Sequence, residues 1–176
     1  MKTLLLVILF PALGFCQGFL PRWEMTLSTD LNSYSNSTGS HWYTALSFSP
    51  GLYVYKGLSV EPELFYGDSK DQPYAINLSG NLCYSYGMGY SAFVPFVLVG
   101  YGIGNGVPFS QPLIRTADNM SDISLLNAGC GLKIMTLGGR ALLRVEYRYQ
   151  AFVAHYPRFT DHIYARRLLL GFAVLL

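Results

Sequence analysis

The sequence predicts an all-β fold, namely an eight-stranded antiparallel up-and-down transmembrane β-barrel. Polar and apolar residues alternate with a period of two through most of the chain, which is typical of strands. Short turns alternate with longer polar connections, as expected for an up-and-down meander. The apolar side chains amount to roughly 35 bulky groups, too many for the interior of so small a barrel, so they are expected to face lipid.

Composition excludes several classes of protein. The chain has 176 residues, enough for one domain, and 51% of them are hydrophobic while only 12% are charged. Typical soluble domains carry about 25% charged residues. The formal net charge of +2 gives no strong field for nucleic acid or acidic substrates. No nucleic-acid partner, cofactor or metal is expected.

The first residues form a unit of their own. Lys2 supplies a positive charge, residues 3–15 are mostly apolar, and small or polar residues follow. This pattern predicts a signal peptide over residues 1–17 and a barrel domain over residues 18–176. Cleavage is expected near Cys16. Lipid attachment at Cys16 is the alternative, although the large Phe15 fits that motif poorly.

Eight segments have strand character. The short turns between them are expected at 56–57, 87–91 and 136–139, and the longer polar loops at 32–40, 67–73, 105–121 and 154–161. The predicted strands are Trp23–Leu31, His41–Tyr55, Leu58–Tyr66, Tyr74–Tyr86, Ala92–Gly104, Asp122–Met135, Arg140–Val153 and His162–Leu176.

Sorting each strand by parity separates two faces. In RVEYRY (residues 144–149), the two arginines and the glutamate share one face, and the valine and both tyrosines share the other. Every strand is expected to present one apolar face and one face of polar residues or glycine. Because a small barrel is barely filled by ordinary side chains, the polar face should line the lumen. The alternative is a soluble lipocalin-like barrel with the apolar set inside.

Aromatic residues lie toward the predicted strand ends. In a transmembrane barrel such residues form girdles at the two membrane interfaces. The predicted girdle residues are Trp23, Trp42, Tyr43, Tyr66, Tyr74, Tyr84, Tyr86, Phe152 and Tyr164.

Several stretches make the chain similar to a known family. The leader, VPFVLVGYGIG (94–104), GGRALLRVEYRY (138–149) and a last strand that ends with the chain carry the resemblance. The chain resembles the small outer-membrane β-barrels of Gram-negative bacteria, of the OmpA, OmpX and opacity-protein type. Family members usually end in an aromatic residue that forms part of the insertion signal. Leu176 stands there instead, which weakens that signal.

The resemblance implies a location, partners and a role. It implies the cell outer membrane, a monomer, and contact with outer-membrane lipid and lipopolysaccharide. It also implies insertion by the barrel-insertion machinery. The expected role is non-catalytic: structural, or a surface interaction in which the long extracellular loops would hold an extracellular ligand.

The inward face collects charged residues. Buried charges must be paired, so we expect a salt-bridge network that fills the lumen. Glu61 and Glu63 are the first candidates to pair with Arg144 and Arg148. The full predicted network is Glu24, Glu61, Glu63, Lys133, Arg144, Glu146, Arg148 and Arg167.

Two other functions stay open at this point. A narrow pore for small solutes would need a continuous water path past the same charges. A lipid A-modifying enzyme, catalysing acyl transfer or deacylation, would use a His with a Ser and an acidic residue at the rim. His41, Asp68 and Ser69 are the candidates, with His155 and His162 at the same rim, but the H-x-S pattern of a deacylase is missing. No catalytic residue is therefore assigned.

Small residues carry two further expectations. GYGIGNG (100–106) is not a nucleotide-binding G-x-G-x-x-G motif, and its glycines are expected to line the lumen where long side chains approach. Cys83 should point inward and Cys130 outward, so both are expected to be free thiols.

Overall fold

The computed structural model describes residues 23–30, 34–36, 39–41, 43–69, 72–87, 92–106, 123–136, 140–155 and 160–176. The predicted signal peptide and the cleavage or lipidation at Cys16 lie outside these ranges. No helix among the described residues is both long and apolar enough to cross a membrane.

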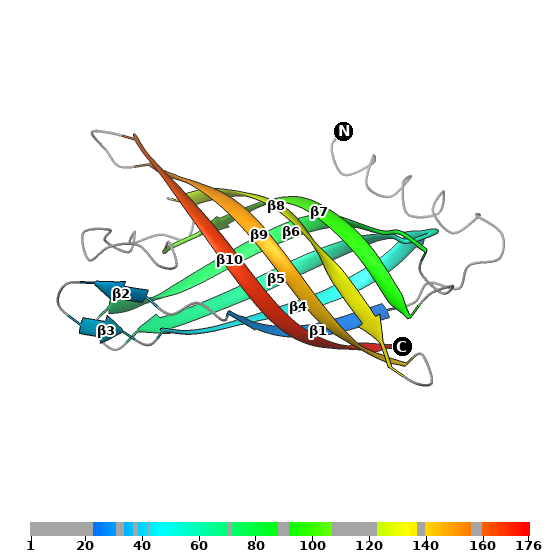
Figure 1. The fold of residues 1–176 in the computed structure, drawn as a ribbon. Helices are drawn as coiled ribbons and strands as arrows, with labels where there is room; N and C mark the ends of the chain where they lie inside the picture. Colours follow the sequence, from blue (N-terminus) through cyan, green and yellow to red (C-terminus); the bar gives the residue numbers. More distant parts are fainter. Residues whose placement is uncertain are drawn as a thin grey trace, which may run out of the picture.

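Eight strands of the described chain close into one antiparallel barrel, in the order β1-β10-β9-β8-β7-β6-β5-β4 (Figure 1). The predicted eight-stranded up-and-down barrel is therefore confirmed. The barrel strands are β1 (Trp23–Asp30), β4 (Tyr43–Tyr55), β5 (Leu58–Ser69), β6 (Gln72–Ser85), β7 (Phe93–Gly104), β8 (Ile123–Met135), β9 (Ala141–His155) and β10 (Thr160–Leu175).

The barrel has two different ends. At the end called here the turn rim, β4–β5, β6–β7 and β8–β9 are connected and β10 terminates (Figure 1). Gly57 has φ +92° in the first of these turns, a conformation that glycine adopts without strain. At the opposite end, the loop rim, β1–β4, β5–β6, β7–β8 and β9–β10 are connected.

Closure depends on two contacts of β10. It pairs with β9 over a long register, from Thr160↔His155 to Val174↔Ala141. On its other edge it pairs with β1, from Glu24↔Leu175 to Asp30↔Leu169. Joining the first and last barrel strands pairs the backbone groups that an open sheet would expose at its edges.

The loop rim differs from the prediction in three places. Residues 154–161 were predicted as a loop, but β9 continues to His155 and β10 starts at Thr160. Residues 67–73 were predicted as a loop, but β5 continues to Ser69 and β6 starts at Gln72. Residues 32–40 were also predicted as a loop, yet they contribute to a separate two-stranded sheet of β2 (Tyr34–Asn36) and β3 (Gly39–His41). Polar composition predicts a loop in each case. Strands that project beyond an apolar wall can be polar on both faces.

The lumen is also more apolar than predicted. The inward face of β7 carries Val94, Phe96 and Leu98, all 3% exposed or less, so both faces of this half-strand are apolar. Phe152 was predicted to belong to the outer girdle, but it is fully buried. β9 stays regular to His155, so Phe152 keeps the inward parity of Arg148 and Gln150.

Candidate functional site: the charged lumen

The eight predicted network residues all lie inside the barrel. Each is 4% exposed or less. They come from β1, β5, β8, β9 and β10, and each has the inward parity of its strand. Strand periodicity alone therefore places all these charged groups in one enclosed space.

Nearest the turn rim, a lysine is held between a carboxylate and a phenol. Lys133 Nζ donates hydrogen bonds of 2.8 Å to Glu24 Oε2 and of 2.8 Å to the Tyr53 hydroxyl. That hydroxyl in turn donates to Glu24 Oε2. Lys133 also lies 5.4 Å from the centre of the Phe96 ring. The ammonium group thus has a carboxylate, a phenol and an aromatic ring as partners.

The middle of the lumen holds two arginines bridged by one glutamate. Arg144 Nη1 donates to Glu61 Oε2 at 2.9 Å and its Nε donates to Glu146 Oε2 at 3.0 Å. Arg148 Nη1 donates to Glu63 Oε1 at 2.7 Å, and its Nε donates to the other oxygen of Glu146. The arginines therefore pair across the lumen with Glu61 and Glu63 of β5, the partners predicted from the sequence.

A relay of amides continues toward the loop rim. Asn81 Nδ2 donates to Glu63 Oε2 at 3.0 Å and Asn127 Nδ2 donates to Asn81 Oδ1 at 3.0 Å. Gln150 Nε2 then donates to Asn127 Oδ1 at 2.7 Å, and its own Oε1 accepts from Arg167 Nη1 at 3.0 Å. Each amide both donates and accepts within this relay.

The relay ends at an ion pair of which the predicted network contained Arg167 but not its partner Asp30. Arg167 Nη2 lies 2.8 Å from Asp30 Oδ2, and its guanidinium carbon lies 4.3 Å from the centre of the Phe65 ring. Asp30 shares the inward parity of Glu24, so parity could have identified it. Tyr53 was also missed, because aromatic residues were assigned to the outer wall.

Together these contacts connect the lumen almost from rim to rim. Lys133 and Glu61 lie 3.8 Å apart and Arg144 and Glu24 lie 3.6 Å apart, which joins the lysine cluster to the arginines. Among the described residues, five buried carboxylates face four buried cations. Each of these cations lies within 3.0 Å of at least one carboxylate oxygen.

Glycines allow the amides to fit. A Cβ added to Gly100 would lie 2.7 Å from the Gly80 carbonyl oxygen and 2.8 Å from Asn81 Cγ. Gly104 similarly faces Asn77. The approaching groups are short Asn side chains and backbone, rather than the long side chains that the sequence predicted.

The outer wall has the opposite chemistry. In the middle of the neighbouring strands β6 and β7, the outward side chains are 48–60% exposed, namely Leu78, Leu82, Val97 and Val99. The alternation therefore places apolar side chains outside and charges inside, as the sequence predicted.

Aromatic residues accompany this wall near its ends. Tyr66 and Tyr74 stack with their ring centres 6.4 Å apart, and Tyr149 and Tyr164 stack at 5.9 Å. The side chains of two predicted girdle residues lie outside the described part of the chain, namely Trp42 and Tyr43. The exposed girdle aromatics are Trp23, Tyr66, Tyr74, Tyr84, Tyr86 and Tyr164.

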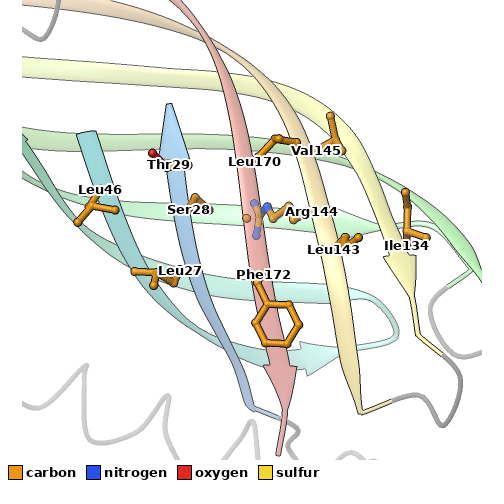
Figure 2. A pocket seen from close by; sticks show the side chains of 11 residues that line it. Leu27, Ser28, Thr29, Leu46, Ile134, Leu143, Arg144, Val145, Leu170 and Phe172 are labelled. Atoms are coloured by element: carbon orange, nitrogen blue, oxygen red, sulfur yellow. The ribbon is translucent and has the colours of Figure 1, made fainter. Parts of the chain in front are cut away.

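A depression of about 420 Å³, called here the wall groove, crosses the outside of β4, β1, β10, β9 and β8 (Figure 2). Its border on the side of the loop rim is a row of outward residues that includes Thr29 and Leu170, which are paired in register. Its border on the side of the turn rim includes Leu27 and Phe172, which are also paired. Between the rows, the inward residue Gly171 leaves only backbone at the surface.

The residues considered for catalysis are spread over different elements. His41 ends β3 and His155 ends β9, and their side chains lie outside the described part of the chain. Asp68 is exposed on β5, and His162 is exposed on β10. Within the described ranges, no group of three His, Cys, Asp or Glu residues could hold a metal ion.

The two described cysteines lie on opposite faces. Cys83 is buried in the lumen and Cys130 is exposed on the wall, and both are free. This agrees with their predicted parity.

Comparison with known proteins identifies the fold. No family model and no curated protein matches the chain. Neisserial surface protein A (NspA) matches with a TM-score of 0.59 and 14% identity over 88% of this chain and 96% of that chain. The N-terminal β-barrel domain of Pseudomonas aeruginosa OprF matches with a TM-score of 0.56 and 15% identity over 88% and 97%. A de novo designed transmembrane β-barrel matches with a TM-score of 0.51 and 14% identity over 90% and 98%. The chain thus has the fold of the small eight-stranded outer-membrane β-barrels.

Proposed function

We propose that this chain is a non-catalytic barrel of the Gram-negative outer membrane that acts through the connections at its loop rim. The observation that supports this proposal best is that the two faces of the sheet have the opposite polarity to those of a soluble barrel. Apolar residues cover the outside, whereas the paired charges occupy the inside. Only a surrounding apolar solvent stabilises such a wall, because a soluble barrel of this size would bury its leucines and expose its charges.

The backbone supports the same environment. The barrel is closed through β1 and β10, so its strands pair on both edges along the shared register. A β-structure within the hydrocarbon core needs this closure because lipid offers no hydrogen bonds. The barrel strands have 8 to 16 residues, and about 9–11 residues tilted by about 45° are enough to span the core.

The lumen supports a closed barrel rather than a pore. Arg144 and Arg148 reach Glu61 and Glu63 on β5 from β9 and so cross the interior. An eight-stranded barrel filled by its own side chains has no aqueous channel. We therefore propose that solutes do not pass, and that the inner network holds the wall in shape.

The proposed role therefore depends on the loop rim. The β2–β3 sheet lies at that rim, and the chain connects β7 to β8 and β9 to β10 there (Figure 1). We propose that this rim faces the cell exterior and either binds an extracellular ligand or stabilises the envelope. The protein would be monomeric, delivered by a cleaved signal peptide and placed by the barrel-insertion machinery, with lipopolysaccharide as its neighbour.

Fractionation of expressing cells tests the proposal. We expect the protein in the outer-membrane fraction, running faster on gels before boiling than after boiling, because a closed barrel resists detergent. Recovery in the soluble fraction without heat-modifiable mobility would overturn it. A planar bilayer containing the purified protein should show no steady conductance.

A further inference from the structure

The seam between β4 and β5 lacks ladder pairs at its centre. Along β4, pairing with β5 stops after Phe48 and resumes at Leu52, and the register is the same on both sides of this gap. Within the gap, Pro50 of β4 and Pro62 of β5 therefore lie opposite each other. Proline has no N–H, and it is rare inside a sheet because it removes a ladder hydrogen bond.

Each of these prolines turns its backbone toward the other. Trp23 and Leu176 exchange backbone hydrogen bonds between β1 and β10, and successive residues of an antiparallel strand face opposite neighbours. Glu24 and its partner Gly51 therefore face each other between β1 and β4, and Pro50 faces β5. Neither proline has an N–H to donate, so both carbonyl oxygens lack the ladder hydrogen bond that this position normally provides.

A buried hydroxyl group lies beside this gap. Ser49 points into the lumen and is 8% exposed, and its Oγ has no hydrogen-bond partner among the described residues. Glu63 lies opposite Ser49 in the same register. On the other side of the prolines, Gly51 leaves space, because a Cβ added there would lie 3.2 Å from Glu61 Cγ. Two carbonyl oxygens and one hydroxyl oxygen that lack partners therefore occupy neighbouring positions.

The lumen also carries an excess of negative charge. Among the described residues, five buried carboxylates face four buried cations. Glu146 is the unmatched carboxylate, because it lies between Arg144 and Arg148, and each arginine already pairs with a glutamate of β5. A buried charge without compensation is costly. The described interior is thus one positive charge short of balance.

These features favour one kind of ligand. Carbonyl, hydroxyl and carboxylate oxygens bind hard cations, and backbone carbonyl oxygens replace the hydration shell of alkali cations in ion channels. One missing positive charge favours a monovalent ion. Such an ion does not require three converging carboxylates, which the described residues do not provide, because most of its ligands here are neutral oxygens.

We infer that the seam between β4 and β5 binds one alkali cation through the carbonyl oxygens of Pro50 and Pro62 and the hydroxyl group of Ser49, with the Glu63 carboxylate beside it. The ion replaces the two missing ladder hydrogen bonds and supplies the missing positive charge. It thereby joins β4 to β5 where the prolines leave them unbonded. The inference rests on the proposed membrane location, because hydrocarbon supplies no donor to these oxygens.

The test compares the stability of the protein in different salts. Purified full-length protein is folded into phosphatidylcholine vesicles, which carry no net charge, and is unfolded by urea in sodium, potassium or N-methyl-D-glucamine chloride at equal ionic strength and pH. N-methyl-D-glucamine is too large to enter the seam. Sodium or potassium should lower the unfolding equilibrium constant about tenfold once its concentration is about ten times the dissociation constant. The line width of sodium-23 in NMR spectra measures sodium binding directly.

Two pairs of substitutions locate the ion. Pro62→Ala restores an N–H that donates to the carbonyl oxygen of the facing proline. It should abolish the alkali-cation effect and raise stability in N-methyl-D-glucamine chloride. Pro95→Ala is the matched control, because the Pro95 carbonyl oxygen already accepts a hydrogen bond from Tyr86 N at 2.8 Å. Ser49→Ala should remove most of the alkali-cation effect, whereas Ser85→Ala, at another buried serine on β6, should leave it unchanged.

The outcomes separate this inference from the proposed function. Equal stability of wild type in all three salts would overturn the inference, as would an alkali-cation effect that Pro62→Ala and Pro95→Ala retain equally. Heat-modifiable mobility is measured on the same samples. If it persists while stability is indifferent to the cation, the inference fails and the proposed function stands. If wild type lacks it, both fail.

Discussion

Arg144 on β9 donates a 2.9 Å hydrogen bond across the barrel to Glu61 on β5, and both side chains are buried. The Arg144 guanidinium also lies 3.0 Å from Glu146 and 3.6 Å from Glu24, and its carbon lies 4.4 Å from the centre of the Phe96 ring. The pair therefore belongs to a larger network and also joins opposite walls. Removing one partner of such a pair leaves the other incompletely compensated.

Glu61→Ala should lower the free energy of unfolding by about 3 kcal/mol, the lower end of the range for breaking a buried pair, because Glu146 and Glu24 still compensate Arg144. The measurement is urea unfolding of the protein folded into lipid vesicles. Arg144→Met and the double variant Glu61→Ala with Arg144→Met complete the cycle, and the double variant should be more stable than the sum of the two single losses predicts. Strict additivity of the two would argue against direct coupling.

Closure of the lumen predicts a conductance phenotype. Arg148 and Glu63 occupy the middle of the lumen, and replacing both by Ala removes a cation together with its carboxylate. The double variant should conduct ions in a planar bilayer, whereas wild type should not. A double truncation on the outer wall, Leu78→Ala with Leu82→Ala, should stay silent. Identical unit conductance in wild type and the lumen variant would show that these two residues do not close the barrel.

Much of the fold was predictable because the period of a strand is two. Parity placed Glu61 and Arg144 inside and Val145 outside without any knowledge of register, since strands that stay regular keep their faces. The bulk of the apolar set then decided which face meets lipid. These inferences need only local pattern and side-chain volume.

The rest depended on information that pattern does not carry. Both faces of β7 are apolar around Phe96, so alternation gave no signal for its lumen side. Polar strand ends such as Gly67–Ser69 look like loops because composition does not report pairing. Phe152 was a different kind of error. Its parity points inward, as the structure shows, although an aromatic residue near a strand end is typical of the outer girdle.

The apolar outer wall predicts how much stability is lost when a charged residue is placed on it. Val99 is 60% exposed and lies near the middle of β7. Val99→Arg should cost about 2–4 kcal/mol in lipid vesicles, as expected for arginine near the bilayer midplane. Tyr86→Arg is the control, because Tyr86 lies in the turn-rim connection and is 70% exposed. It should cost at most about 1 kcal/mol. If both changes were harmless, the wall would be facing water.

Two glycines on adjacent strands give a paired test of lumen packing. Gly100 points inward, and a methyl group there would lie 2.7 Å from the Gly80 carbonyl oxygen, a backbone atom that no rotamer change can move. It would also displace Asn81, which donates to Glu63 at 3.0 Å. Gly100→Ala should therefore cost about 1–3 kcal/mol, the usual effect of overpacking.

Gly80→Ala is the matched change on the outer face, where an added methyl group has no neighbour within 4 Å. It should be neutral or stabilising by up to about 1 kcal/mol, because it removes chain entropy from the unfolded state without a clash. Urea unfolding of both variants in the same vesicles measures the contrast. Equal stability of the two would mean that the Asn81 amide moves aside without loss. The relay from Glu63 through Asn127 to Gln150 would then not be rigid.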